Sequence, residues 1–322
     1  MSDESLDHVP PKLSKYDWVG EGAVCIVYQV HPRIVVKHPL KSGYEQFHRE
    51  VQFYGLLKRK SICRDIVECF LLLPNAIFLS YCAAGSLSQR LMSRQIREDL
   101  EEYPGRVIEV TAKDDTELIS RWMRQLTSAA AFLETMNVAH NDIHPRNLLL
   151  DQFLDMKLSD FDSYATVGED LPGAPAPWAR VLADGPDKGS FGTCGPRTEQ
   201  FAIGSVLYMM LYGHEPYEDI AMDPEEVVER FQYMRFPELK RTPLEDIIRD
   251  CWFGHFPSMR ALQSAVFACT ADLPLQASLG KADSAEEVGL CKELVRSGLL
   301  DCGPGPCFLE TWRGGHIQPS PC

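Results

Sequence analysis

The sequence predicts an α+β protein in two lobes: a small β-rich lobe with one helix, then a larger, mainly helical lobe. Alternating polar and apolar residues at 17–38 are typical of strands. Beyond residue 116, apolar residues recur at three- and four-residue steps, which is typical of helices. A length of 322 residues exceeds what one compact core usually holds and also favours two lobes.

The first lobe is expected to contain a three-stranded meander followed by a helix. The strand pattern at 17–38 is interrupted by Gly20 and Gly22 and again by the turn sequence HPR. At 44–58 the pattern becomes helical, with an apolar stripe formed by Phe47, Val51, Tyr54 and Leu57. Two further strands, "IVECFLLLP" and "NAIFLSYC", meet at a Pro-Asn turn and complete this lobe.

The second lobe is expected to be mainly helical. Residues 93–115 are charged and poorly periodic, which indicates a surface insertion. An amphipathic helix is expected at 117–136, followed by a hairpin-like strand in "DMKLSDFDSY". A Pro- and Gly-rich segment at 171–197 then precedes a helix at 198–213, which is apolar nearly all round and is therefore expected to be buried on every side.

These elements divide the chain into four parts. We expect an N-terminal extension at 1–16, the small lobe at 17–82 and the larger lobe at 83–275. A C-terminal helix and a turn-rich tail are expected at 276–322.

The C-terminal helix is predicted at 285–297. Ser284 and Glu287 are spaced as a capping box at its start, and Gly298 stands where the helix would end. We expect this helix to pack on the larger lobe.

Composition argues against several classes of protein. A formal net charge of -14 argues against nucleic-acid binding, which needs a basic surface, and mildly favours basic partners. The N-terminal residues lack the basic and apolar regions of a secretory signal, and the apolar runs are too short to cross a bilayer. We therefore expect a monomer that has no nucleic-acid or membrane partner.

The 11 cysteines are scattered without a repeated metal-binding spacing. Such an irregular set, in a chain with no export signal, is expected to be reduced, which favours a cytoplasmic or nuclear protein. Cys302 and Cys307 could chelate a metal or form a disulfide, but an ordinary turn-rich tail is the favoured interpretation.

Several polar residues fall on elements that are otherwise apolar. Lys37 ends the strand "IVVK" and shares a face with Val35, because side chains alternate along a strand. Glu50 adjoins the apolar stripe of the first helix, so a helix crossing the sheet could bring it to Lys37 as an ion pair. At the first strand turn, the backbone amides of Gly20 and Gly22 could approach a phosphate closely.

An acid, an amide and a second acid stand close together in the sequence of the larger lobe. Asp142 lies in "VAHNDIHPRNLLL", Asn147 follows five positions later, and Asp160 follows thirteen positions after that. Phosphoryl transfer needs a group that accepts a hydroxyl proton. Mg²⁺ prefers carboxylate and carboxamide oxygens and keeps several waters. The set therefore matches the needs of metal-assisted phosphoryl transfer.

In this order the motifs resemble those of the protein kinase superfamily over roughly residues 15–275. "GEGAVCIV" at 20–27 resembles the Gly-rich phosphate loop, and "VVK" ending at Lys37 resembles the β3 lysine motif. Glu50 resembles the glutamate that pairs with that lysine. "HNDIHPRN" resembles the catalytic loop, "DFD" at 160–162 resembles D-F-G, and "YCAAGSL" resembles the hinge. The resemblance implies a bilobal protein-kinase-like fold.

The resemblance also implies a role for each of these residues. Asp142 would accept the proton of the acceptor hydroxyl, while Asn147 and Asp160 would hold Mg²⁺ on the phosphates of ATP. Lys37, steadied by Glu50, would neutralise those phosphates. The implied nucleotide-binding set comprises Gly20, Gly22, Val27, Val35, Lys37, Ser80, Tyr81 and Leu149, of which Val27, Val35 and Leu149 would enclose the adenine. The implied internal apolar spine contains Tyr54, His140 and Phe161.

The chain departs from the family pattern around these motifs. Cys25 replaces the third glycine of the phosphate loop. Asn141 replaces the arginine before Asp142, so we expect no phosphorylation switch of the usual kind in the activation segment. His144 replaces a catalytic lysine, as in small-molecule phosphotransferases with an "HxDxHPxN" motif, and is expected to assist transfer only weakly. Asp162 replaces a glycine and is expected to face solvent.

Two further departures concern the larger lobe. Glu199 replaces the aspartate that begins the central helix and keeps a carboxylate one methylene further out. No A-P-E motif precedes this helix, and Phe256 stands where the family has the arginine that pairs with the glutamate of that motif. Because both partners of the ion pair are absent, we expect the fold to tolerate the loss.

The groups that would contact nucleotide, metal or the acceptor proton are all retained. This favours a divergent protein kinase, with full or weak activity, that uses ATP and Mg²⁺ to phosphorylate Ser or Thr of a protein substrate. A nucleotide-binding pseudokinase scaffold and a small-molecule phosphotransferase of the aminoglycoside or choline type are the alternatives. The acceptor would be selected by the segment at 163–197, which has no periodicity to interpret.

Overall fold

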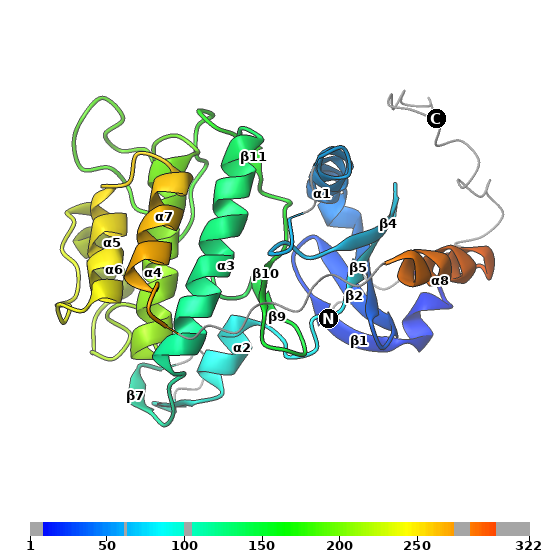
Figure 1. Ribbon diagram of the computed structural model, residues 1–322, viewed down its shortest axis with the longest axis horizontal. Coiled ribbons are helices and arrows are strands. Elements are labelled where there is room, and N and C mark those ends of the chain that lie inside the picture. Colours follow the sequence, from blue (N-terminus) through cyan, green and yellow to red (C-terminus); the bar gives the residue numbers. More distant parts are fainter. Residues whose placement is uncertain (1–8, 61–62, 100–104, 274–283, 301–322) are drawn as a thin grey trace. The chain divides into compact units, whose positions relative to one another are not determined.

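A five-stranded sheet and a series of helices belong to two units of the chain, seen in the computed structural model of Figure 1. The structure describes residues 9–60, 63–99, 105–273 and 284–300. The sheet unit comprises Met1–Val51, Cys69–Tyr81 and Asp283–Cys322, and the helical unit comprises Gln52–Glu68 and Cys82–Ala282. The predicted α+β class is confirmed, because one unit is β-rich and the other is mainly helical.

All five strands of the sheet unit pair antiparallel, in the order β1-β2-β3-β5-β4. The strands are β1 (Asp17–Glu21), β2 (Cys25–His31), β3 (Ile34–Pro39), β4 (Cys69–Leu73) and β5 (Ala76–Ser80). Burial alternates along most of β2, whereas β3 is buried along its whole length. The predicted meander and the two later strands are confirmed.

The apolar core of the sheet unit includes helix α8, Ala285–Arg296, from the C-terminal part of the chain (Figure 1). The α8 segment contributes Cys291, Val295 and Leu299, which are almost completely buried. They join a core from the sheet and its N-terminal flank, made of Leu13, Ile26, Tyr28, Val30, Ile34, Val36, Leu40, Phe70, Ala76 and Phe78. The expectation that this helix packs on the larger lobe is therefore wrong. An amphipathic pattern reveals an apolar face but not the surface that covers it.

Ion pairs hold the first turn of α8. Arg33, in the turn between β2 and β3, pairs with Glu286 and Glu287, each at 2.9 Å. The predicted capping box is absent, because Ser284 makes no capping bond and Glu287 pairs with Arg33. Gly298 has a left-handed φ of 78°, which fits its predicted place just after the helix.

Helix α1, Tyr44–Leu57, confirms the helix predicted after the meander. Its Phe47 and Tyr54 are fully buried, as the apolar stripe predicted. The boundary between the two units falls within α1, after Val51. Glu50 therefore belongs to the sheet unit, and Tyr54 belongs to the helical unit.

The helical unit is built around α4, whose residues are buried on nearly every side, as its all-round apolar pattern predicted. The helices of this unit are α2 (Leu87–Met92), α3 (Thr116–Thr135), α4 (Pro196–Tyr212), α5 (Pro224–Gln232), α6 (Pro243–Phe253) and α7 (Met259–Cys269). Side chains cap several helix starts: Ser86 on α2, Asp115 on α3 and Thr242 on α6 each accept a backbone N–H of the first turn.

Short strands of the helical unit form three antiparallel pairs, β6 with β7, β8 with β11 and β9 with β10. Their bounds are β6 (Gln95–Arg97), β7 (Val107–Val110), β8 (Val138–Ala139), β9 (Leu148–Leu150), β10 (Met156–Leu158) and β11 (Ala165–Thr166).

The β6–β7 hairpin lies within the charged region expected to be a surface insertion. Gln95 Nε2 donates to Gly213 O at 2.6 Å, and Val107 N donates to Glu218 O at 2.8 Å. The hairpin is therefore docked on the residues that follow α4. Its pairing was not expected from the sequence, because the strands are short and lie in a charged, poorly periodic region.

No helix among the described residues combines the length and the apolarity that crossing a bilayer requires. Eight cysteines in this part of the chain are free thiols. Cys302 and Cys307, considered above as a possible pair, lie outside the described residues.

The packing of α8 leads to a prediction of stability. Leu299→Ala is expected to lower the free energy of unfolding by about 2–5 kcal/mol, the usual cost of truncating a buried leucine. Lys292→Ala, at an exposed position on α8, is the matched control and should change it by less than about 0.5 kcal/mol. Urea denaturation measures both, and equal stability of the two variants would show that α8 does not belong to this core.

Candidate active site

A buried ion pair stands at the centre of the sheet unit. The Lys37 Nζ lies 2.6 Å from the Glu50 Oε2. Lys37 comes from β3, which is buried throughout, and Glu50 comes from the same face of α1 as Phe47. Glu50 is fully buried and Lys37 is 8% exposed. The pairing expected from the two sequence patterns is confirmed.

The glycine-bearing turn joins β1 to β2 and precedes Lys37 and Glu50 in the sequence. Gly22 N donates to Cys25 O at 2.9 Å, which closes the turn. A Cβ placed on Gly20 or Gly22 would meet no atom within 4 Å, so the turn has open space on that side. Cys25 itself is buried, so its side chain does not project from the turn.

The predicted nucleotide-binding residues are divided between the two units. In the sheet unit, Val27 is opposite Lys37 in the β2–β3 register, and Val35 is opposite Leu79 of β5. Ser80 ends β5, and the next residue, Tyr81, donates its backbone N–H to Arg33 O at 3.0 Å. Leu149 belongs to the helical unit, where it is half-buried in β9. That all these residues bind one nucleotide remains a prediction.

A buried carboxylate supports the loop that contains Asp142. Glu199, in the first turn of α4, accepts the backbone N–H of His140 and that of Asn141, each at 2.9 Å. Burial raises the pKa of Glu199 to about 7, although both N–H donors oppose this shift. The longer side chain that replaces the family aspartate therefore still binds the loop through both oxygens.

His140 extends this support. Asp142 N donates to the His140 Nδ1 at 3.2 Å, and the His140 Nε2 lies 2.9 Å from Ser159 O. The neutral ring with its proton on Nε2 satisfies both contacts. Burial lowers the pKa of His140, which also favours the neutral ring. His140 is thus both a satisfied core histidine and a support for Asp142.

The carboxylate of Asp142 meets Asn147 and His144. Asn147 Nδ2 donates to Asp142 Oδ2 at 2.8 Å and to Asp142 O at 2.9 Å. The His144 Nε2 lies 3.3 Å from the same Oδ2. Burial raises the pKa of Asp142, but the contacts with His144, His140 and Asn147 together hold it below its usual value. Asp142 is therefore an ionised carboxylate at neutral pH, with Oδ1 left to accept a proton.

The ring of His144 has a defined orientation. Arg146 N donates to the His144 Nδ1 at 3.2 Å, so the neutral ring carries its proton on Nε2, which faces Asp142. A second proton on Nδ1 would face the Arg146 N–H and remove that bond. His144 therefore acts on Asp142 as a hydrogen-bond donor through Nε2.

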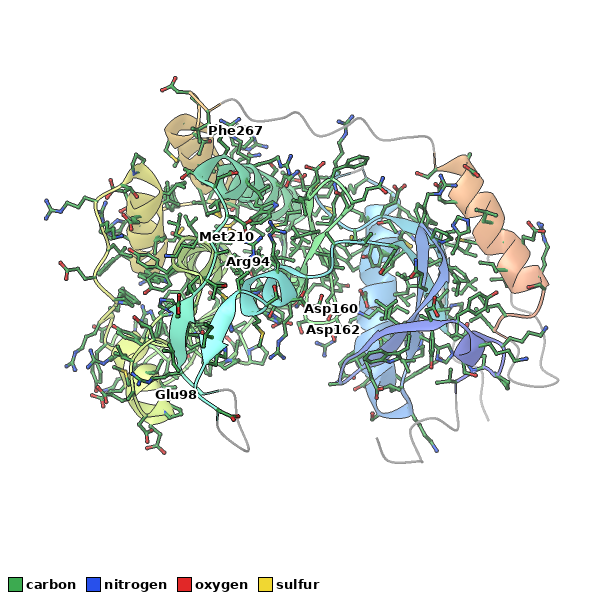
Figure 2. All side chains as sticks on the ribbon, turned by 90° about the horizontal axis from the view of Figure 1, so that it is seen from below. Arg94, Glu98, Asp160, Asp162, Met210 and Phe267 are labelled. Atoms are coloured by element: carbon green, nitrogen blue, oxygen red, sulfur yellow. The ribbon has the colours of Figure 1, made fainter. Side chains whose placement is uncertain are left out.

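The two acids of "DFD" follow β10 and are labelled in Figure 2. Asp160 has a left-handed φ of 65°, a conformation uncommon for residues other than glycine. The residue before it, Ser159, donates both its N–H and its hydroxyl to Asn147 O, each at 2.9 Å. This brings the backbones of the two predicted metal ligands together. Asp162, which was expected to face solvent, is half-buried and accepts a bond from Ser163 Oγ at 2.9 Å.

Phe161 lies in an aromatic cluster of the helical unit. Its ring stacks on Phe53 with centroids 3.8 Å apart and planes inclined by 7°. Edge and tilted contacts join it to Tyr54 at 5.9 Å and to His140 at 4.8 Å. The predicted spine of Tyr54, His140 and Phe161 is present. Phe53 was missed, because it lies beside the apolar stripe of α1 rather than on it.

Local contacts hold the segment 163–197 to the loop of Asp142. Asn141 Nδ2 donates to Ser163 O at 3.2 Å, and β11 pairs with β8. Ser205 Oγ, from α4, donates to Pro177 O at 2.6 Å. A small apolar cluster adds to these contacts, made of Ala139, Leu171, Ala179 and Cys194. Asn141 thus contacts the start of the segment directly.

Trp178 lies beside the same loop, although sequence patterns did not single it out. Its ring centroid is 6.1 Å from that of His144. The preceding Pro177 is fixed by Ser205, which also accepts a bond from Trp252 Nε1 at 2.9 Å. The only sequence signal was one tryptophan in the Pro-rich "LPGAPAPW", and such a segment has no period from which to place it.

Phe256, which stands where the family has the arginine of an ion pair, is bound by Gln200 of α4. Gln200 Nε2 donates to Phe256 O at 2.9 Å, and Phe256 N donates to Gln200 Oε1 at 3.1 Å. A neutral pair of hydrogen bonds therefore joins these regions, and no charge is stranded there. Sequence reasoning missed Gln200, because its partner is a backbone group 56 positions away.

Comparisons with known proteins agree with these observations. The family model "Protein tyrosine and serine/threonine kinase" matches residues 19–266. The maternal embryonic leucine zipper kinase of Xenopus tropicalis is 26% identical over 219 residues, which is 65% of this chain and 28% of that protein. The CBL-interacting serine/threonine-protein kinase 14 of Arabidopsis thaliana is 26% identical over 274 residues, which is 73% of this chain and 56% of that protein.

A third relative, the serine/threonine-protein kinase ULK3 of Xenopus laevis, is 27% identical over 228 residues, 65% of this chain and 44% of that protein. The chain thus spans between 28% and 56% of the length of these three relatives.

The raised pKa of Glu199 leads to a prediction of pH dependence. Its side chain holds more protons in the folded than in the unfolded protein between its ordinary value of 4.5 and about 7. Its contribution to stability is therefore complete below the lower value and is lost as the pH rises through the upper one. In Glu199→Gln the group cannot titrate. The free energy of unfolding of the wild type minus that of the variant should fall across this range, by at most about 1.4 kcal/mol per pH unit.

Urea denaturation of both proteins at several pH values measures this difference. If this difference in free energy of unfolding rose with pH instead, the two N–H donors would lower the pKa of Glu199 by more than burial raises it.

Proposed function

The chain belongs to the protein tyrosine and serine/threonine kinase family, and we propose that it transfers the γ-phosphoryl group of ATP to serine or threonine hydroxyls of a protein substrate. Ser/Thr acceptors are supported by relatives that are serine/threonine kinases by name, such as the CBL-interacting serine/threonine-protein kinase 14 of Arabidopsis thaliana. A protein substrate is supported by the family as a whole.

The buried Lys37–Glu50 pair is the observation that carries this proposal. Burying two charges costs several kcal/mol per ion before their attraction is counted, and apolar replacements of such pairs are often neutral or stabilising. Retention of the complete pair at 2.6 Å is therefore better explained by function than by stability. A lysine so positioned can neutralise nucleotide phosphates, and kinases need this pair in place for transfer.

Asp142 is the proposed base. The acceptor hydroxyl oxygen forms a bond to the γ-phosphorus, the bond from that phosphorus to the β,γ-bridging oxygen breaks, and ADP leaves. The hydroxyl proton passes to the Asp142 carboxylate. Asn147 and His144 occupy Oδ2, which orients Oδ1 toward the acceptor. Glu199 and His140 act as positioning residues, since they bind the backbone of the Asp142 loop rather than the Asp142 carboxylate.

Asn147 and Asp160 fit a Mg²⁺ site. The amide nitrogen of Asn147 is bound to Asp142, so its Oδ1 is the atom that a cation would meet. One carboxamide and one carboxylate suffice, because Mg²⁺ keeps waters and takes other oxygens from the nucleotide. When bound, the ion would neutralise charge on the phosphates of ATP.

A specific observation supports each of two alternatives, a small-molecule phosphotransferase and a pseudokinase. His144 next to Asp142, in place of a lysine, resembles the arrangement implied for small-molecule phosphotransferases, whose motif "HxDxHPxN" the chain matches. The lack of a lysine at this position also suits a pseudokinase that binds nucleotide and transfers nothing. The retained pair and the ionised Asp142 favour an active enzyme over the second alternative.

Location and regulation are proposed on narrower grounds. Eight free thiols among the described residues support the cytoplasm or nucleus, where cysteines stay reduced. The direct contact between Asn141 and Ser163 supports an activation segment that is held without phosphorylation.

Phosphate transfer is the first test. The protein incubated with Mg-ATP and a mixed protein substrate should give phosphoserine or phosphothreonine. Asp142→Asn removes the base while keeping the size of the side chain, and should slow transfer by at least about 100-fold. Radiolabelled ATP followed by phosphoamino-acid analysis measures both results.

A thermal shift with Mg-ATP, recorded on the same samples, separates the alternatives. Stabilisation without transfer would support the pseudokinase, and phosphate found only on small alcohols would support the small-molecule enzyme. If nucleotide neither stabilises the protein nor is consumed, the proposed function is wrong.

A second prediction concerns His144. His144→Lys places a permanent positive charge beside Asp142 and the transferred phosphoryl group, and should raise kcat by up to about tenfold, equivalent to about 1.4 kcal/mol. His255→Lys, on an exposed side chain after α6, is the matched control and should leave kcat unchanged. A lower kcat in His144→Lys, at unchanged melting temperature, would show that the neutral imidazole itself is required.

A further inference from the structure

A cavity of about 400 Å³ in the helical unit opens beside Asp142. Its walls come from the catalytic loop, from the Pro-rich segment at 175–178, from α2 and β6, and from the loop that follows α4. The volume lies within the range of ligand sites in proteins. Its position next to the proposed base makes it a binding site for part of the acceptor.

Two charged groups in the wall are already paired. Arg97 donates to Glu218 at 2.5 Å, to Gln95 Oε1 at 2.6 and 2.9 Å, and to Gly105 O at 3.0 Å. Glu218 also accepts the backbone N–H of Glu215 at 2.9 Å. These groups brace the β6–β7 hairpin against the loop after α4, and they have little capacity left for a ligand.

Unlike Arg97 and Glu218, Glu215 has a side chain that is free to bind a ligand. Its carboxylate lines the cavity, and within the described part of the chain its side chain makes no hydrogen bond or ion pair. Burial and then the nearby Glu218 raise the pKa of Glu215 to about 7, although Arg97, Arg146 and His144 oppose the shift. A poorly solvated carboxylate with no donor gains most from a bound cation.

The rest of the cavity suits an aliphatic stem. Met92 and Met209 offer flexible apolar surface, and Trp178 offers an aromatic face. Lysine and arginine pack their methylenes along such surfaces and place the charged head beyond them. A guanidinium or ammonium group can also lie over a tryptophan ring.

We propose that this cavity binds a lysine or arginine side chain of the acceptor protein, with Glu215 as its counter-ion. This inference rests on the proposed kinase function. The net charge of -14 favours approach of a basic partner. Arg146, exposed in the wall, opposes a cation and limits the preference for basic residues.

Peptide phosphorylation tests the proposal. A serine peptide set in which arginine replaces alanine at one position at a time is assayed for kcat/KM. Arginine at one position should raise kcat/KM by at least about tenfold in the wild type. In Glu215→Gln this arginine-to-alanine ratio should fall toward one, whereas Arg146→Gln should increase it. Glu109→Gln, exposed on β7, is the matched control and should keep the wild-type ratio.

The pH dependence adds an independent readout. Glu218, Arg97, Arg146 and His144 are the charged or titratable groups around Glu215. Because Glu215 loses its charge as the pH falls through about 7, the wild-type preference for arginine should weaken from pH 8 to pH 6. In Glu215→Gln the ratio should stay flat over the same range.

Failure of this inference can be told apart from failure of the proposed function. Each arginine peptide, with alanine in place of the acceptor serine, is titrated by calorimetry into wild type and Glu215→Gln, and both proteins are checked for an unchanged melting temperature. Weaker binding to the variant supports the proposal even if no phosphate is transferred. Equal binding to both proteins, or a preference for acidic peptides that Arg146→Gln abolishes, would overturn it.

Discussion

The carboxylate of Glu199 is the constraint on which the candidate site of the helical unit depends. It accepts the N–H groups of the two residues before Asp142, and so links the buried helix α4 to the proposed base. His140 carries the constraint further, because its ring accepts the N–H of Asp142 and packs against Phe161. Burial makes the charge of Glu199 costly, and the two N–H donors offset part of that cost. Substituting glutamate for the family aspartate therefore changes the length of this support and leaves its role intact.

Features with short-range sequence signals could be predicted. The spacing of Glu50 beside an apolar stripe, together with a lysine on a buried strand, was enough to predict their ion pair. Asp142 and Asn147 lie five positions apart in one loop, so their contact also follows from local sequence. The strands of the sheet and helices α1, α3 and α4 were predicted for the same reason, since their periodicity reports burial directly.

Features that depend on distant or irregular segments could not be predicted. The apolar face of α8 was visible, but the choice of the sheet unit as its partner depends on Arg33 and on the core around Leu299, which periodicity does not report. Trp178 is placed by a bond between Ser205 and Pro177, 28 positions apart, within a segment that has no repeat. The cavity beside Asp142 follows from the same long-range contacts. Acceptor choice, which we propose depends on this cavity, was therefore hidden from the sequence.

The phosphoryl-transfer groups come from both units, Lys37 from the sheet unit and Asp160 from the helical unit. The proposed function requires both side chains to act on one triphosphate. A double-mutant cycle with Lys37→Met and Asp160→Asn, in which calorimetry measures the affinity for Mg-ATP, tests this requirement most directly. We expect the losses in binding free energy to be non-additive, with a coupling of at least about 0.5 kcal/mol. An unchanged affinity for Mg-ATP in either single variant would mean that this residue does not act on the triphosphate and would contradict the account.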